Sequence, residues 1–440
     1  MNKRIDEYLR QHAMTTPERV AVEDGEAQLT YAQLDHAVTE RAAQLREAHG
    51  TGQPVVLHAS QTVAFLVDYL AIHRAGCAAV PVSHDATEDD EAAIREQLQH
   101  CTLPADAADI LFTTGTTGRQ KGVILTHQAL IADAENLIHG QGFHGDLAFV
   151  ISGPLNHIGS LSKLWPMLIV GGTISITAGV KDMNAFFQAI RRQTLPVATF
   201  LVPASIRMLL TFGRKELDQL ARQIEFVETG AAPIAESDML RLRDALPASR
   251  LFNTYASTET GIVSTYDYAH HSVKAGCLGR PLPHATAVIG EDGCLVCGGE
   301  TVMAGYVDPA MTATVLREGR VYTSDRATLD ADGNILLQGR SDDLINVGGY
   351  KVSPVEVEDA ALAFPGVADC VCIAADHPVI ATVTKLLFVP RPGTTVSRHD
   401  LARFLASKLE RYKVPQLYEQ VERVHRTFNG KLDRKSYQQK

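Results

Sequence analysis

The sequence has neither a long hydrophobic run nor an excess of positive charge. Among its 440 residues no apolar stretch reaches the roughly 18 residues that a membrane-spanning helix needs, so no membrane span is predicted. The charged segment at residues 1–12 lacks the apolar core of a signal peptide, and a cytoplasmic location is the default expectation. The formal net charge of −10 argues against nucleic acid as the main partner. With 45% hydrophobic and 21% charged residues, the composition is that of a globular protein.

A disulfide framework is also missing. The seven cysteines show no set of spacings typical of paired cysteines. Cys294 and Cys297 form a CxxC motif and Cys370 and Cys372 a CxC motif, but no second CxxC completes the four ligands of a structural zinc site. We therefore expect buried free thiols at these positions and no metal bound by them.

Internal repeats and low-complexity segments are likewise absent, and the length predicts two or three domains. In the first third, strand patterns at residues 55–58 and 77–82 alternate with helix patterns at 29–46 and 63–74, where Thr30 is a plausible helix cap. This alternation predicts parallel sheets covered by helices. Later helix patterns span residues 128–139, 160–170, 180–193, 204–211 and 237–246.

The last third changes its pattern twice. Residues 279–338 are rich in strand patterns, with turns at Asp292-Gly293 and Asp332-Gly333, and an α/β pattern returns after Arg340. We therefore expect an α/β fold with two domains. A large N-terminal domain, residues 1–339, would combine parallel sheets with a β-rich subdomain, and a small C-terminal α+β domain would span residues 340–440.

A segment rich in threonine and glycine, residues 113–121, lies between two apolar runs. Its glycines let the backbone turn so that successive N–H groups point inward as an anion site, and its hydroxyls and one lysine add donors. Because Gly122 follows Lys121, where a Walker A motif has Ser or Thr, this is not that motif. A surface turn is the alternative to a phosphate-binding loop. The predicted phosphate ligands are Thr113, Thr114, Gly115, Thr116, Thr117, Gly118 and Lys121.

This segment resembles the phosphate loop of the adenylate-forming superfamily, which includes acyl-CoA synthetases, aryl-CoA ligases, luciferases and the adenylation domains of peptide synthetases. Seven further segments resemble motifs of the superfamily in the same order, so the resemblance extends from about residue 30 to residue 434. Eight motifs in order are far more specific than any one of them. The loop departs from the family at Gln120, where proline is usual, and this departure suggests a more mobile loop.

The segment Asn253–Glu259, with the sequence NTYASTE, resembles the family motif NxYGxTE. The resemblance implies that Tyr255 stacks on adenine and that Asn253 bonds the edge of the base. It also implies that Thr258 contacts the α-phosphate and that Glu259 holds Mg²⁺, an ion that prefers hard oxygen ligands. The departure is Ala256, whose methyl group would narrow the slot for the acid and favour a small or planar acyl group.

Two later segments complete the resemblance to a nucleotide site. Residues 322–325 resemble the motif YxTGD, with Ser324 in place of glycine, and imply that Asp325 binds both ribose hydroxyls. Residues 339–343 resemble the hinge motif GRxDD, which implies that Arg340 also reaches the ribose and that Asp342 is the pivot of a mobile C-terminal lid. Exposed Arg–Asp pairs are common on protein surfaces, and this is the alternative reading.

The acid pocket is predicted from two more motifs. Residues 154–159 resemble the segment that gates the pocket. Residues 229–233 (TGAAP) resemble a turn that lines both the acid pocket and adenine, the latter through Ala231. No Asp occupies residues 154–160, so an α-ammonium group would be buried without a partner, which argues against α-amino acids. For His157, a histidine packed in the core is the alternative. The predicted pocket residues are His157, Ile158, Gly230, Ala256, Ser257 and Ile262.

The predicted lid carries two motifs. Residues 347–352 resemble the loop that lines the thiol tunnel, with Gly348, Gly349 and Lys351 along it, and a β-turn is the alternative. Residues 429–434 (NGKLDR) resemble the family's C-terminal motif and imply that Lys431 is the catalytic cation. A carboxylate and an anionic phosphate about 4 Å apart repel by about 4 kcal/mol at an effective dielectric constant near 20. An ammonium group between them would offset that repulsion.

The resemblance therefore implies a two-step ligase that uses ATP and Mg²⁺. An aryl or short- to medium-chain acid becomes an acyl-adenylate, and a rotation about Asp342 then lets a thiol displace AMP. The sequence ends at Lys440 without a carrier-protein segment, so the expected acceptor is CoA or the phosphopantetheine of a separate acyl or peptidyl carrier protein.

Three alternatives stay open at this point. They are a stand-alone amino-acid adenylating enzyme, a luciferase-like oxidase and an inactive binding paralogue. The departures at Gln120, Ala256 and Ser324 are compatible with the last of these. The residues with clear chemical roles are nevertheless all present, which argues against loss of activity.

Overall fold

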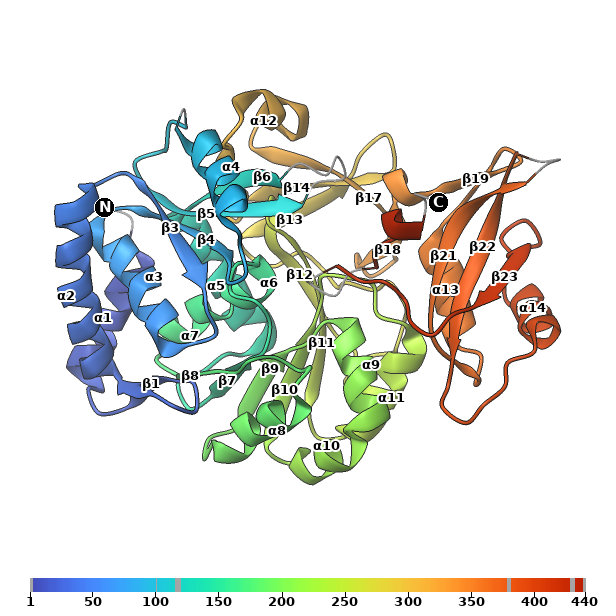
Figure 1. The fold of residues 1–440 in the computed structure, drawn as a ribbon, viewed down its shortest axis with the longest axis horizontal. Helices are drawn as coiled ribbons and strands as arrows, with labels where there is room; N and C mark the ends of the chain where they lie inside the picture. Colours follow the sequence, from blue (N-terminus) through green and yellow to red (C-terminus); the bar gives the residue numbers. More distant parts are fainter. Residues whose placement is uncertain (1–2, 100, 115–119, 378–380, 428–431, 438–440) are drawn as a thin grey trace.

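The large N-terminal part of the molecule is built on two mixed β-sheets with helices packed around them (Figure 1). This computed structural model describes residues 3–99, 101–114, 120–377, 381–427 and 432–437. In the eight-stranded sheet the six inner strands are parallel, and each edge strand is antiparallel to its neighbour. Its order is β12 (Gly261–Asp267), β11 (Arg250–Ser257), β10 (Ile224–Thr229), β9 (Val197–Phe200), β7 (Ala148–Ile151), β8 (Thr173–Ile176), β1 (Val20–Glu23) and β2 (Gln28–Thr30).

The second sheet has five strands and contains the predicted phosphate-loop segment. Three neighbouring strands (β3, β4 and β5) are parallel, as the alternating pattern predicts. The strand β6 is antiparallel to β5, and β15 is antiparallel to β6. The order is β15 (Gly305–Tyr306), β6 (Gln120–Thr126), β5 (Ala107–Thr114), β4 (Ala78–Ser83) and β3 (Pro54–Ala59). Both ends of the predicted loop are therefore strands of one hairpin, a feature that the sequence pattern did not predict.

The β-rich subdomain forms a third, antiparallel sheet, as expected from residues 279–338. It consists of β13 (Ala285–Ile289), β14 (Cys294–Gly299), β16 (Leu316–Arg317), β17 (Arg320–Leu329) and β18 (Ile335–Arg340). The predicted fold class is confirmed in these features: a large α/β part with partly parallel sheets, a β-rich subdomain and a smaller C-terminal part.

The helices of the large part follow the predicted pattern closely. α2 (Tyr31–His49) begins with a capping box at Thr30, whose hydroxyl accepts a hydrogen bond from the Gln33 N–H. The other helices described in this part are α1 (Ile5–Thr15), α3 (Val63–Ala75), α4 (Glu88–Leu98), α5 (His127–Gln141), α6 (Ile158–Leu161), α7 (Leu164–Val170), α8 (Met183–Arg192), α9 (Pro203–Phe212), α10 (Arg214–Leu220), α11 (Glu236–Ala245) and α12 (Pro309–Val315). Three of these, α4, α10 and α12, were not predicted.

The single helix predicted at residues 160–170 is two short helices. α6 ends at Leu161 and α7 begins at Leu164, so Ser162 and Lys163 lie between them. Pro166 explains the interruption, because proline has no N–H to donate to the carbonyl of Ser162. The break matters below, since it places the buried side chain of Lys163 against β10.

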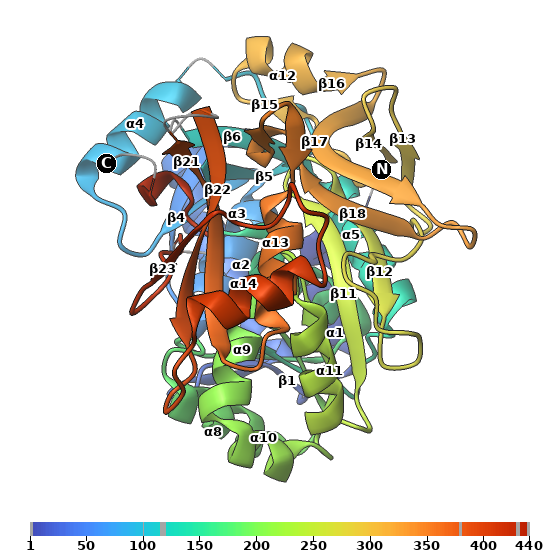
Figure 2. The ribbon, with the colours of Figure 1, turned by 90° about the vertical axis from the view of Figure 1, so that its right-hand side faces the viewer.

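The C-terminal part, called the lid from here on, follows the short helix η1 (Ser341–Asp343) (Figure 2). Its apolar side chains form two buried clusters, one of which includes Ala235 of the large part. A three-stranded sheet forms its centre. Its elements are β19 (Ile345–Val347), β20 (Tyr350–Val352), α13 (Pro354–Leu362), β21 (Val367–His377), β22 (Ala381–Pro390), α14 (Arg398–Ala406), β23 (Leu417–Gln420) and η2 (Lys435–Tyr437). The predicted domain boundary at residue 340 coincides with the end of β18 but remains a prediction.

The cysteines are free thiols, and all but Cys101 are buried. Within the described residues, no helix is both long enough and apolar enough to cross a membrane.

Candidate active site

Tyr255, Asp325 and Arg340, which the resemblance assigns to adenine and ribose, come together from three strands. The Tyr255 hydroxyl on β11 donates a 2.6 Å hydrogen bond to Oδ2 of Asp325 on β17. Arg340, at the end of β18, pairs with Asp325 in the β17–β18 register, and its Nε lies 4.0 Å from Asp325 Oδ1. Burial and the Asp325 charge both raise the pKa of the Tyr255 hydroxyl, so it stays a hydrogen-bond donor.

Ser324, the departure from the family's glycine, takes part in this cluster. Arg340 Nη2 donates a 2.6 Å hydrogen bond to the Ser324 hydroxyl and lies 3.5 Å from Oδ2 of Asp342. A glycine at position 324 would offer no side-chain oxygen. The substitution therefore gives Arg340 an additional partner and does not remove a function from the cluster.

Glu259, the predicted Mg²⁺ ligand, is held by a tyrosine that the motifs did not reveal. The Tyr306 hydroxyl on β15 donates a 2.8 Å hydrogen bond to Glu259 Oε1. β15 pairs with β6, the strand that carries Lys121, and Lys121 Nζ lies 5.7 Å from the centre of the Tyr306 ring. The predicted metal ligand and the predicted phosphate-binding cation thus approach the same tyrosine from different sheets.

The phosphate loop itself can be placed only by its ends. Thr113 on β5 is the register partner of Lys121 on β6, so the two ends of the segment lie side by side. Thr114 is described as part of β5. Gly115, Thr116, Thr117 and Gly118 lie outside the described residues, and so does Lys431.

Asn253 is buried on β11, and Thr258 is buried just after this strand. Asn253 Nδ2 donates a 2.9 Å hydrogen bond to the Cys277 carbonyl, which fixes the amide in place. The turn that follows β11 is closed by Ser257 and Thr260, whose side chains each accept a hydrogen bond from the backbone N–H of the other. The backbone N–H of Met303 donates to the carbonyl of Glu259. Glu259 is therefore supported through both its side chain and its main chain.

The residues predicted to line the acid pocket lie at α6, at the ends of β10 and β11, and on β12. Gly230 lies so close to β11 that an added Cβ would be 2.9 Å from the Thr254 carbonyl oxygen. Ala231 has φ of +66°, a strained conformation for a residue other than glycine. Ile262 is buried, and its backbone N–H donates a 2.6 Å hydrogen bond to Asp133 Oδ1 on α5. His157, Ile158, Ala256 and Ser257 are half-buried, and His157 is the residue immediately before α6.

Residues that line the predicted thiol tunnel are not gathered into this cluster. Gly348, Gly349 and Lys351 are exposed in the turn and strand of the β19–β20 hairpin. Asp342, the predicted pivot, has a side chain that is 51% exposed. This places the hinge where a change of backbone conformation would disturb little packing.

The lid meets the large part through charged side chains that the sequence did not indicate. Arg207 on α9 bonds Asp238 of α11 at 2.8 Å and Asp369 of β21 in the lid. Asp369 also accepts two 2.8 Å hydrogen bonds from Arg426, whose main chain bridges to Leu432. Arg426, and through its bridge Leu432, are therefore linked by way of Asp369 to Arg207, and these are the described residues on either side of residues 428–431.

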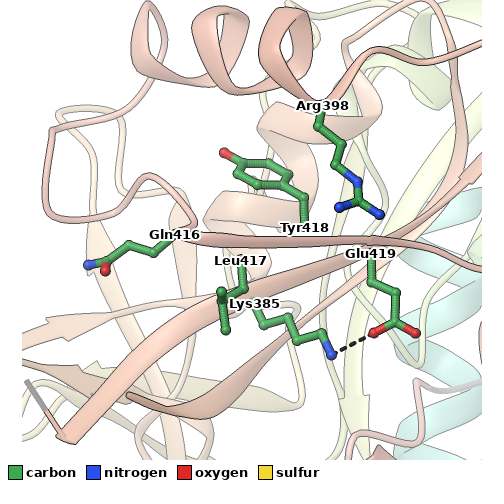
Figure 3. A pocket seen from close by; sticks show the side chains of 6 residues that line it. All are labelled: Lys385, Arg398, Gln416, Leu417, Tyr418 and Glu419. Atoms are coloured by element: carbon green, nitrogen blue, oxygen red, sulfur yellow. Dashed lines mark ion pairs between the residues drawn. The ribbon is translucent and has the colours of Figure 1, made fainter. Parts of the chain in front are cut away.

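A hollow on the outer face of the lid does not belong to this cluster. It lies along β22, β23 and the start of α14, and its charged residues Lys385 and Glu419 pair with each other at 2.6 Å (Figure 3). None of the residues predicted to bind nucleotide, acid or thiol lines it.

Fold and site together define a two-domain nucleotide-binding enzyme. The sequence matches the family model described as AMP-binding enzyme over residues 9–103 and 89–307, and the AMP-binding enzyme C-terminal domain over residues 356–431. The first match covers more than half of the chain, so the chain belongs to the AMP-binding enzymes. The resemblance to adenylate-forming enzymes is thereby confirmed.

Named relatives specify the class further. Feruloyl-CoA synthase of Amycolatopsis sp is 28% identical over 98% of each chain. The 2-succinylbenzoate–CoA ligase of Staphylococcus aureus (strain MRSA252) is 30% identical over 75% of this chain and 66% of its own length. Indoleacetate–CoA ligase of Aromatoleum aromaticum is 29% identical over 73% of this chain and 65% of its own length. The predicted enzyme class, an AMP-forming acid–thiol ligase, is confirmed.

Solved structures show the same fold. ATP-bound MatB from Rhodopseudomonas palustris superimposes with a TM-score of 0.86 at 23% identity, over 99% of each chain. The o-succinylbenzoate CoA synthetase MenE from Bacillus subtilis, in complex with the acyl-adenylate intermediate OSB-AMP, gives a TM-score of 0.83 at 23% identity over 98% of each chain. These likenesses support the fold.

Proposed function

We propose that this enzyme activates an aryl or short- to medium-chain carboxylic acid with ATP and transfers the acyl group to the thiol of CoA. The observation that carries the proposal is the convergence of Tyr255, Asp325 and Arg340 on one side and of Glu259 and Lys121 on the other. The first group suits a nucleoside and the second a metal-bound polyphosphate. The acid–CoA ligases among the relatives favour CoA over a carrier protein.

The first step joins the acid to AMP. A carboxylate oxygen attacks the α-phosphorus of ATP, the bond from that phosphorus to the bridging oxygen breaks, and pyrophosphate leaves. Lys121 and Lys431 would offset the repulsion between the anions, and Thr258 would contact the α-phosphate. The half-buried carboxylate of Glu259 has the hard oxygen that Mg²⁺ requires, and Mg²⁺ would neutralise charge on the phosphates when bound.

The second step transfers the acyl group. The thiol sulfur attacks the acyl carbon, the bond to the phosphate oxygen breaks, AMP leaves and the thiol proton passes to solvent. In this proposal Gly348, Gly349 and Lys351 line the path of the thiol. They are exposed here, so the lid would turn about Asp342 before thiol transfer to bring them to the acyl-adenylate.

Acid-dependent ATP–pyrophosphate exchange tests the first step. The panel contains benzoates, cinnamates, short and medium fatty acids and amino acids, and we expect exchange with aryl acids or with short- to medium-chain acyl acids and none with amino acids. Glu259→Gln should lower exchange at least about 100-fold by weakening Mg²⁺ binding. Glu291→Gln, an exposed carboxylate in a turn, is the matched control and should leave exchange unchanged.

The acceptor is tested with the best acid of the panel. We expect AMP release and thioester formation with CoA, and none with a phosphopantetheinylated carrier protein alone. Thioester on the carrier protein only would reverse the choice of acceptor. Folded protein that supports no exchange with any acid would contradict the proposal and favour an inactive binding paralogue.

A further inference from the structure

A fully buried ion pair lies beneath the predicted acid pocket. Lys163 Nζ, between α6 and α7, donates a 2.8 Å hydrogen bond to Oε1 of Glu228 on β10, and each side chain is only 1% exposed. Burying two charges is costly unless their remaining hydrogen-bonding capacity is used. Within the described part of the chain, Glu228 Oε2 is buried and has no hydrogen-bond partner. One acceptor of the pair is therefore left for another group.

Phe200 connects this pair to the acid pocket. Lys163 Nζ lies 5.2 Å from the centre of the Phe200 ring. The same ring adjoins two glycines of the predicted pocket motifs, because a Cβ added at Gly159 would be 3.1 Å from its Cε1 and one added at Gly230 would be 3.5 Å from its Cε2. The ring is thus in contact with the pocket motifs on its edges and with the ammonium group on its face.

The strand geometry relates the ion pair to the pocket motif. Glu228 lies on β10, and Gly230 follows Thr229, the last residue of this strand. Glu228 is the register partner of Phe200 on the neighbouring strand β9, and a Cβ added at Gly230 would be 3.5 Å from the Phe200 ring. Phe200 therefore lies beside both the ion pair and the pocket motif.

Asp133 closes the group on the side of α5. Its Oδ1 accepts the backbone N–H of Ile262, a predicted pocket residue, and its Oδ2 is also buried without a partner among the described residues. Burial raises the pKa of the Asp133 carboxyl to about 8, although the Ile262 N–H and the Lys163 charge act in the opposite direction. With this pKa the Asp133 carboxyl is mostly protonated at neutral pH and adds little negative charge beside the ion pair.

From these contacts we propose that Lys163 and Glu228 form the polar end of the acid pocket and select an aromatic acid with a neutral ring hydroxyl. This inference rests on the proposed function. A hydroxyl can donate to Glu228 Oε2 and accept from Lys163, while the aromatic ring packs beside Phe200. A hydrocarbon end would leave the acceptor unpaired, and a second carboxylate would add an unbalanced negative charge.

The glycines at positions 159 and 230 agree with this choice. A side chain at Gly159 would press on the Phe200 ring, and one at Gly230 would meet the Thr254 carbonyl oxygen 2.9 Å away and touch the ring at 3.5 Å. In this proposal the aromatic ring of the acid would take the space that these glycines leave beside Phe200, and the buried charges would face its hydroxyl.

The experiment compares acids of equal size. ATP–pyrophosphate exchange is measured with benzoate and with its hydroxy, methyl and carboxy derivatives at the 3- and 4-positions, and with the corresponding cinnamates. A methyl group matches a hydroxyl in volume but forms no hydrogen bond. We expect the best hydroxy acid to exceed its methyl counterpart about 100-fold or more in kcat/KM, and the dicarboxylic acids to be the poorest substrates.

The variant Lys163→Met/Glu228→Leu removes both charges at once, because either single change would leave a buried charge unpaired. In this variant the hydroxy and methyl acids should come within about threefold of each other, chiefly through KM, as the methyl acid improves. Arg74→Met/Asp6→Leu, which removes a buried pair between α3 and α1, is the matched control and should keep the preference for the hydroxy acid. Circular dichroism establishes that each variant is folded.

The outcomes separate the two proposals. Exchange with methyl and hydroxy acids at similar rates by the unmodified enzyme would overturn this inference and leave the proposed function intact. So would a double variant that keeps the preference, because the ion pair would then be structural only. Absence of exchange with every acid tested would instead contradict the proposed function.

Discussion

The nucleotide cluster of the large domain and the interface of the lid are held together in different ways. Tyr255, Asp325 and Glu259 lie on or beside strands and are fixed by hydrogen bonds to partners within the same domain. The contacts of the lid with the large domain include the ion pair of Arg207 and Asp369, and the chain enters the lid near the exposed residue Asp342, the predicted pivot. If the lid turns there, as we predict, bonds of the first kind would persist and bonds of the second kind could be exchanged. The comparison suggests that ligand binding and the change of reaction step are assigned to separate sets of contacts.

The largest effect should come from the cation that the lid supplies. Lys431→Ala is expected to lower ATP–pyrophosphate exchange about 1,000-fold, because the variant loses the ammonium group predicted to lie between the carboxylate and the α-phosphate in the transition state. Thioester formation from supplied acyl-adenylate should stay within about threefold of normal, since in that step the thiol attacks carbon and no anion approaches the phosphate. Separate assays of the two half-reactions measure both. Equal losses in the two half-reactions would contradict the prediction that Lys431 serves only the first of them.

A rigid hinge should produce the opposite pattern. Asp342→Pro restricts the backbone where the lid is expected to turn, and the side chain is half exposed, so packing is hardly disturbed. We expect exchange to remain within about threefold and thioester formation to fall about 100-fold, because the thiol loop would be misplaced. The neighbouring change Ser341→Pro is a positional control. Normal thioester turnover in Asp342→Pro would show that the pivot lies elsewhere.

A smaller effect is expected from the interdomain ion pair. Arg207→Gln removes the link from α9 to Asp369 and so weakens the anchor of the segment around Lys431. We predict a roughly tenfold loss of kcat in the first half-reaction, equivalent to about 1.4 kcal/mol, with KM for ATP unchanged. Arg207→Lys should restore part of the rate.

The control for that variant is another arginine on the same face of the large domain. Arg214 pairs with Asp218 and Asp244 but makes no ion pair with the lid among the described residues, so Arg214→Gln should leave both half-reactions unchanged. If Arg207→Gln slowed both half-reactions equally, its role would be structural and not specific to one lid position.

The smallest effect concerns stability and should be confined to the large domain. Burial raises the pKa of Asp133 to about 8 in the folded protein, whereas an unfolded aspartate has a pKa of about 3.9. Between these two pKa values the carboxyl of the folded protein therefore binds a proton that the unfolded protein has released. The stabilisation is fully present below about pH 4 and is lost as pH rises toward about 8.

Melting temperatures measured from pH 5 to pH 9 test this sign. Asp133→Asn keeps a carbonyl oxygen for the Ile262 N–H and cannot ionise, so the melting temperature should fall less with pH than in the unmodified protein. Asp85→Asn, at an exposed position, should reproduce the normal slope. An unchanged slope in Asp133→Asn would mean that the carboxyl is ionised in the folded state at neutral pH.

Local signals in the sequence were sufficient for much of the fold and for part of the site. The cap at Thr30, the alternating strands and helices, and the NTYASTE and hinge segments all have meaning within a few residues, and the structure brings Tyr255, Asp325 and Arg340 together. The helix break before Leu164 was also signalled locally, by Pro166, but the apolar pattern across it was continuous.

The residues that sequence analysis missed act through partners far away in the chain. Tyr306 reaches Glu259 from 47 positions away, Lys163 meets Glu228 over 65, and Arg207 meets Asp369 over 162. A lone tyrosine, lysine or arginine carries no local mark of such a partner. Only the crossing order of the strands and the packing of α9 and α11 against the lid bring these pairs within reach.

Arg340 contacts both the large domain, at Ser324, and the predicted hinge, at Asp342. Its Nη2 lies 2.6 Å from the Ser324 hydroxyl and 3.5 Å from the Asp342 carboxylate. If a bound nucleotide drew the guanidinium toward Asp325 and away from Asp342, nucleotide binding and the position of the lid would compete for this one group. By thermodynamic linkage the two equilibria would then influence each other by the same factor. The position of the lid should therefore be readable as nucleotide affinity, and nucleotide occupancy as a bias on the lid.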